Sequence, residues 1–184
     1  SMHEQGFLLA YFTTLRKRFA GEAELAELDN ALATVNSALG LFQAADTLWS
    51  DAVGKLSGAQ KDEAALAHAE LLLRMGEYTR AHGVLSPMLA SEHVQRARAL
   101  LANADVLIAE NQFVDAHIAF IEAFDCILPD APYYVPALER FAELLVNLGD
   151  PFGAADKLKD VLAIRRNAYA NDDSIESVRA FGRA

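Results

Sequence analysis

The amino-acid sequence predicts an all-α protein, a right-handed superhelix of about four antiparallel helical hairpins. Alanines recur at steps of 36, 35 and 38 residues, and a bulky apolar residue follows each of them four positions later. The pairs are Ala45 and Trp49, Ala81 and Leu85, Ala116 and Phe120, and Ala154 and Leu158. The chain has no long alternating run and no Asn-Gly turn, so strand signals are nearly absent. A period of this length in helix-forming sequence is typical of a helical-hairpin array.

Glycines between the apolar-periodic segments mark where helices are expected to end. They are Gly21, Gly40, Gly58, Gly76 and Gly149. Ser91 before Glu92 favours one helix start, and Pro132 near a first turn favours another. We therefore expect helices at about residues 4–19, 22–38, 41–56, 60–75, 78–89, 92–109, 113–127, 132–147, 151–168 and 174–182. Connections of two to five residues make neighbouring helices antiparallel.

The hairpins share one internal pattern of large and small residues. The first helix carries a large residue, then a large-small pair three and four positions later, and another large residue three further on. The small residue lets the second helix approach closely, and an Ala in the second helix lies where the two backbones cross. The third copy fits best, with Leu100, Asn103, Ala104 and Leu107 followed by Ala116, Phe120 and Ala123.

The whole chain, residues 1–184, is predicted to be one domain. Residues 3–25 form an N-terminal capping helix, 26–168 the four hairpins, and 169–184 the start of a further helix. The capping helix has an apolar stripe that includes Phe7, Tyr11 and Leu15, expected to pack on the next helix. Two alternatives stay open for this stripe, a membrane-surface helix and a homodimer contact. It is also open whether the chain is complete or a fragment of a longer protein.

The turn sequences Met75-Gly76-Glu77-Tyr78, Asn111-Gln112-Phe113 and Leu148-Gly149-Asp150 resemble the inter-helix turn of the tetratricopeptide repeat (TPR) family. With the Ala pattern, the resemblance covers about residues 26–168 and implies a TPR-like α-solenoid. The copies are degenerate, because the usual opening Trp is missing and His68 and Asn103 replace a usual Leu. Residues 160–167 (DVLAIRRN) also resemble the longer repeats of kinesin light chains, over a stretch too short to imply function.

The resemblance implies that the first helix of each hairpin lines a concave groove. Such arrays bury their repeats against each other and bind proteins on the remaining surface. Four further residues of this face are Thr34, Leu66, Leu101 and Ile108. The predicted partner-binding residues are Glu27, Asn30, Glu63, Glu70, Arg74, Arg98, Asp105, Glu139, Glu143 and Asn147. Because acids prevail, we expect a protein or peptide partner with a Lys- or Arg-rich segment. The alternative is a structural subunit of a large assembly that makes contacts through the solenoid ends.

Composition and motifs argue against other functions. A net charge of −10 argues against general affinity for nucleic acid or anionic membrane. The chain has no Gly-rich phosphate loop, no paired-His zinc motif and no nucleophile elbow, so we expect no enzyme, cofactor or metal. Cys126 is the single cysteine and is expected to be a buried, inert thiol. It favours a reducing compartment, and we expect a cytoplasmic or other intracellular protein.

Overall fold

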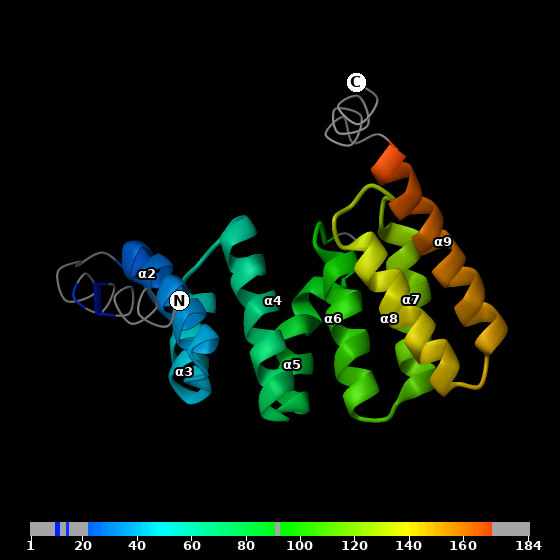
Figure 1. Ribbon diagram of the computed structural model, residues 1–184. Helices are drawn as coiled ribbons and strands as arrows, with labels where there is room; N and C mark the ends of the chain where they lie inside the picture. Colours follow the sequence, from blue (N-terminus) through cyan, green and yellow to red (C-terminus); the bar gives the residue numbers. More distant parts are fainter. Residues whose placement is uncertain (1–9, 12–13, 15–21, 91–92, 171–184) are drawn as a thin grey trace, which may run out of the picture.

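The computed structural model describes residues 10–11, 14, 22–90 and 93–170. In this part of the chain every element is a helix, and the helices stand side by side in one row (Figure 1). They are α2 (Glu22–Ala38), α3 (Phe42–Val53), α4 (Gly58–Met75), α5 (Tyr78–Leu85), the 3₁₀ helix η1 (Ser86–Leu89), α6 (Arg96–Ala109), α7 (Phe113–Cys126), α8 (Tyr134–Asn147) and α9 (Pro151–Ala170). The predicted helices at 4–19 and 174–182 lie outside the described residues, apart from helical Ala10, Tyr11 and Thr14.

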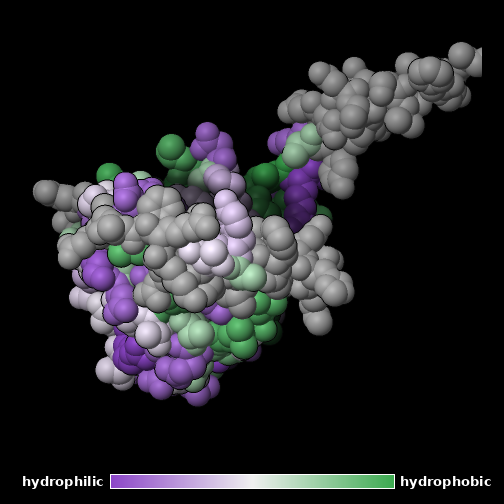
Figure 2. All heavy atoms as spheres, turned by 90° about the vertical axis from the view of Figure 1, so that its left-hand side faces the viewer, coloured by the Kyte–Doolittle hydropathy of each residue, from purple (hydrophilic) through white to green (hydrophobic). Residues whose placement is uncertain are grey.

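Successive helices form four antiparallel hairpins, α2–α3, α4–α5, α6–α7 and α8–α9. Viewed from the end that carries α2 and α3, hydrophilic residues prevail at the lower left and hydrophobic residues at the lower right of the surface (Figure 2). The row of hairpins is the predicted all-α superhelix, and the first helices of successive hairpins face one another along it.

One turn type joins the two helices of every hairpin. Gly40, Gly76 and Gly149 have φ values of 77°, 76° and 80°, in the left-handed region that favours glycine. Asn111 takes the same place in the third hairpin with a φ of 61°, which Asn tolerates better than most residues. After each of these residues a backbone N–H bonds back to a carbonyl five positions earlier, as in Glu77 N–H to Leu72 O at 2.9 Å.

Small residues lie where the helices cross. Ala45, Ala81 and Ala116 are fully buried, and Ala154 is 2% exposed. The bulky residues four positions later are also buried in the first three hairpins, where Trp49, Leu85 and Phe120 are at most 2% exposed. The fourth, Leu158, is 45% exposed, because no described element covers that face of α9. The small Ala side chains thus let the two helices of each hairpin approach closely, and the core forms where the repeat pattern predicts it.

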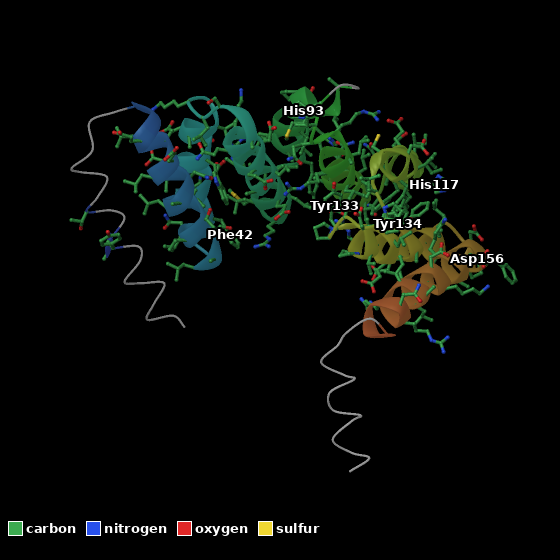
Figure 3. The ribbon with its side chains drawn as sticks, turned by 90° about the horizontal axis from the view of Figure 1, so that it is seen from above. Phe42, His93, His117, Tyr133, Tyr134 and Asp156 are labelled. Atoms are coloured by element: carbon green, nitrogen blue, oxygen red, sulfur yellow. The ribbon has the colours of Figure 1, made fainter. Side chains whose placement is uncertain are left out.

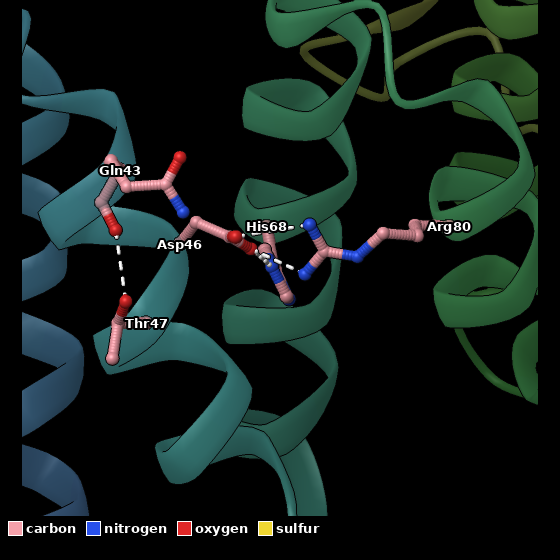
Figure 4. A network of polar contacts seen from close by, with 5 residues as sticks. All are labelled: Gln43, Asp46, Thr47, His68 and Arg80. Carbon is pink, nitrogen blue, oxygen red and sulfur yellow. Dashed lines mark hydrogen bonds and ion pairs between the residues drawn. The ribbon is translucent and has the colours of Figure 1, made fainter.

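A buried polar network joins the first two hairpins (Figure 4). The Asp46 carboxylate on α3 is 2.7 Å from Nε2 of His68 on α4, and it accepts two hydrogen bonds from Arg80 on α5 at 3.0 and 2.7 Å. Burial raises the pKa of Asp46, but the hydrogen bonds from Arg80 and His68 outweigh burial and hold the pKa below its ordinary value. The unusual His68 therefore packs against a carboxylate and against Trp49, 6.1 Å away between ring centroids.

Three expectations about local structure are wrong. The predicted helix at 78–89 ends at Leu85 and continues as η1, because Pro87 has no backbone N–H for an α-helical bond. Similarly, α6 begins at Arg96 rather than near residue 92. Cys126 is exposed rather than buried, at the end of α7, and its Sγ accepts a hydrogen bond from Arg96 at 3.2 Å.

Candidate interaction groove

Three hollows lie in a row along the first helices of the hairpins. One of about 240 Å³ lies among α2, α3 and α4, one of about 170 Å³ among α4, α6 and the entry to α8, and one of about 180 Å³ between α6 and α8. Glu70 lines the first two, and Asp105 and Arg140 line the last two. Because neighbouring hollows share residues, they form one continuous surface, here called the groove.

The structure brings most of the predicted partner-binding residues together on this surface. Those that line a hollow are Glu70, Arg74, Arg98, Asp105, Glu143 and Asn147, together with Thr34, Leu66, Leu101 and Ile108. Those that lie on the same helices without lining a hollow are Glu27, Asn30, Glu63 and Glu139. Leu66 and Leu101 are buried and form an apolar floor at the centre.

Arginines pair with several of these acids. Arg98 donates to Glu63 at 2.9 Å and Arg140 donates to Asp105, so each pair joins the first helices of two hairpins. Arg165 on α9 donates to Glu139 at 2.6 Å. Hydrogen bonding from Arg98 holds the pKa of Glu63 below its ordinary value. The first two pairs connect repeats, and the third joins the two helices of the fourth hairpin, so the acids in all three are not free to bind a partner.

Two other predicted residues are engaged within the first two hairpins. The indole N–H of Trp49 donates to Oδ1 of Asn30 at 2.9 Å, which ties α3 to α2. Gln60 donates to Glu27 at 3.1 Å and ties α4 to α2. Because Gln60 is neutral, the negative charge of Glu27 stays uncompensated.

Three lining charges carry no ion pair among the described residues, namely Glu70, Arg74 and Glu143, and all three are exposed. Glu70 lies near the middle of the row. Its charge raises the pKa of Asp105 and that of Arg98, which shows how close the three groups are. Glu70 and Glu143 are therefore the lining carboxylates that a cation from a partner meets without displacing an arginine.

Asp105 is the most perturbed acid of the groove. Burial raises its pKa from 3.8 to about 6, the charge of Arg140 lowers it in part, and Glu70 raises it further. Nε of Arg140 is itself buried and has no hydrogen-bond partner among the described residues. Ionised Asp105 is thus destabilised by its burial despite the pairing with Arg140. Protonation of its carboxylate near pH 6 removes the negative charge.

Arg140 and Tyr133 line the central hollow but were not among the predicted groove residues. Tyr133 directly precedes α8 and lines this hollow together with residues of α4 and α6 (Figure 3). Both Tyr133 and Tyr134 pack against the core of the last two hairpins, and Tyr134 meets Phe124 edge-on at 5.7 Å. The two tyrosines thus fill space at the entry to α8, within the longest step of the repeat, the 38 residues from Ala116 to Ala154. A sequence signal for Arg140 exists: Glu63 and Arg98, and Asp105 and Arg140, are both 35 residues apart.

Comparison with solved structures identifies the architecture. MamA 41-end from Desulfovibrio magneticus RS-1 matches with a TM-score of 0.64 and 17% identity, over 90% of this chain and 97% of that one. A MamA RS-1 double mutant matches with a TM-score of 0.70 and 18% identity, over 89% and 86%. The TPR-like repeats of a kinesin-light-chain-type protein from Podospora anserina match with a TM-score of 0.70 and 18% identity, over 92% and 89%. The chain has a TPR-like fold.

The TPR-like fold confirms the resemblance that the turn sequences and the Ala pattern indicate, although no family model and no curated protein matches the sequence. Solenoids of this kind expose extended surfaces that suit protein partners. Within the described residues, no group of three or more His, Cys, Asp or Glu is placed to hold a metal ion. No helix of the same part of the chain is long and apolar enough to cross a membrane.

Proposed function

We propose that this TPR-like protein is a non-catalytic, intracellular interaction module that holds a partner segment in the groove. The partner is a protein or peptide segment, extended or helical, that carries Lys or Arg and apolar anchors. The observation that carries the proposal is the continuous row of hollows with an apolar floor at Leu66 and Leu101 beside the unpaired Glu70. Apolar anchors supply affinity in such a groove, and charge selects the partner.

Charge on the groove helices supports a basic partner. Pairing cancels Glu63, Asp105 and Glu139 against Arg98, Arg140 and Arg165. Among the predicted partner-binding residues, the charges that then have no ion pair within the described part of the chain are Glu27, Glu70 and Glu143, against Arg74. This excess of negative charge repels acidic segments and attracts basic ones.

Rigidity supports binding as well. The pairs Glu63–Arg98 and Asp105–Arg140 hold successive first helices in register, and Trp49–Asn30 holds the first hairpin together. Side chains held in place lose little entropy when a partner binds, so more of the contact energy appears as affinity.

A peptide-display selection against the immobilised protein tests the proposal. Selected peptides are expected to be enriched in Lys and Arg. Their binding is expected to fall at least about tenfold in the double variant Glu70→Lys/Glu143→Lys, with a weaker dependence on salt. Both acids are exposed and unpaired, so the reversals leave the folded structure intact.

The matched control is Asp115→Lys/Asp125→Lys on α7, which changes net charge equally at exposed positions that line none of the groove hollows. This control is expected to bind as the unmodified protein does. A selection without basic enrichment, or an equal loss in both double variants, refutes groove binding.

A second function, that of an assembly subunit, is favoured by the face of α9. Leu158 and Leu162 are 45% and 60% exposed, and Phe152 is 84% exposed, whereas residues equivalent to Leu158 are buried in the other hairpins. We propose that this surface packs against a second copy of the chain. The predicted homodimer contact of the N-terminal helix involves residues that are mostly outside the described part.

Light scattering over a range of concentrations separates the two functions. An assembly subunit gains mass with concentration and loses this gain in Leu158→Lys/Leu162→Lys. A groove-binding module stays monomeric, and both forms then give the same mass.

A further inference from the structure

A fourth hollow, of about 520 Å³, lies where α3 ends, α4 begins, and α5 and η1 end. It is larger than each groove hollow and shares no lining residue with them. Its walls are mainly apolar, with Val53, Ala65, Val84 and Met88 among them. His93 lies at its edge, at the start of the segment that leads into α6 (Figure 3). Its volume lies within the range of small-molecule sites, roughly 300–1,000 Å³, and such sites also have mainly apolar walls.

The hollow is bordered by a glycine that neither the backbone conformation nor close packing requires. Gly83 lies inside α5, where glycine costs about 1 kcal/mol relative to Ala. A Cβ at Gly83 would meet no atom within 4 Å, and its φ is not positive, so neither close packing nor backbone conformation requires glycine. Gly54, also in the lining, has a right-handed φ of −69° and equal free space. Side chains at these two positions would occupy or border the hollow.

One charge at the edge of the hollow is available to a ligand. Oδ1 of Asp62 lies 3.5 Å from Nε2 of His93, so these two partly buried side chains face each other. Lys61 is exposed and carries no ion pair among the described residues. An anion held beside the apolar walls would therefore meet the Lys61 ammonium.

We propose that this hollow binds a small apolar molecule that carries one carboxylate, of the class of medium-chain fatty acids. The apolar part lies against Val53, Ala65, Val84 and Met88, and the carboxylate lies at Lys61. A few polar groups at the edge of an apolar concavity orient such ligands. The site is independent of the groove, because the two surfaces have no residue in common.

Titration calorimetry with decanoate tests the site. The unmodified protein is expected to bind one decanoate saturably. Gly83→Phe, alone and together with Gly54→Phe, is expected to weaken binding at least about tenfold, because the added rings take up space in the hollow. Ala44→Phe, at an exposed position of α3 outside the hollow, is the matched control and is expected to bind normally. Circular dichroism checks that every variant keeps its helix content.

The carboxylate contact has its own test. Lys61→Gln is expected to weaken decanoate binding about three- to tenfold, and decyltrimethylammonium, with the same chain and a cationic head, is expected to bind poorly. Lys61→Glu is expected to reverse this preference. No saturable binding of decanoate, equal binding to the Gly83→Phe form, or equal binding of the two head groups would overturn the proposal.

Discussion

Replacing Asp105 with Asn is expected to stabilise the protein at neutral pH, although it removes one partner of an ion pair. Burial raises the pKa of Asp105 from 3.8 to about 6 despite the neighbouring Arg140. In the unfolded chain the carboxyl ionises near its ordinary pKa. Between about pH 4 and pH 6 the folded state therefore holds a proton that the unfolded state has lost, and the free energy of unfolding falls as pH rises.

The size of this effect follows from the two pKa values. The shift from 3.8 to about 6 is roughly two pKa units, each worth about 1.4 kcal/mol, so ionised Asp105 destabilises the folded state by up to about 3 kcal/mol above pH 6. The side chain is 25% exposed, and access to solvent makes this value an upper bound. Asn has a similar shape, keeps an acceptor for Arg140 and carries no charge.

The assay is urea unfolding followed by circular dichroism, at about pH 4 and about pH 7.5. Low protein concentration is needed, because the pI of about 4.9 favours association in the acidic range. Asp105→Asn is expected to be the more stable form at the higher pH and to match the unmodified protein at the lower pH.

Glu63→Gln is the matched control, because the pKa of Glu63 is lowered by Arg98 rather than raised. Ionised Glu63 stabilises the fold above its ordinary pKa of 4.5, and this contribution is lost as pH falls through the folded pKa. The control variant is thus less stable at neutral pH. If Asp105→Asn is also less stable there, pairing with Arg140 outweighs burial and the reasoning is refuted.

Three further predictions concern packing and the buried network. Asp46→Ala is expected to lower the free energy of unfolding by about 3–5 kcal/mol, because it leaves the buried His68 without its partner. Arg80→Ala is expected to lower it less, because the Arg80 side chain is 44% exposed, and urea unfolding compares the two variants. Phe120→Ala is expected to cost about 3–5 kcal/mol, and Phe152→Ala under about 0.5 kcal/mol, in the same assay, because only Phe120 is fully buried. Gly83→Ala is expected to raise stability by about 0.5–1 kcal/mol, and an unchanged or lower melting temperature would contradict this.

The sequence predicts the fold well because local chemistry determines it. Glycine after α4 takes the left-handed turn that ends the helix, and Ala81 lies where α4 and α5 cross, so turn and packing signals agree. Boundaries fail where two signals conflict. Pro87 converts the end of the predicted helix at 78–89 into a 3₁₀ turn, and α6 begins at Arg96 rather than near residue 92.

The groove is less predictable, because its charges depend on how hairpins stack. Repeat positions place Glu63 and Asp105 on the first helices, but only the distance between neighbouring helices decides that Arg98 and Arg140 reach them. Likewise, the apolar neighbours of Cys126 in sequence indicate a buried thiol, whereas its place at the end of α7 exposes it. Periodicity predicts on which face of a helix a residue lies. Which residues meet across repeats can be known only from the geometry of the whole array.

These internal ion pairs change what selects a partner. A Lys or Arg of a partner that binds at Asp105 must displace Arg140. One ion pair is then broken for each one formed, so the exchange adds little net affinity. A cation that binds at Glu70 displaces nothing, and it lies within reach of the apolar floor at Leu66. Charge selection in this groove therefore depends on the few unpaired carboxylates, whereas Glu63 and Asp105 act mainly by holding successive hairpins at the spacing that keeps the hollows open.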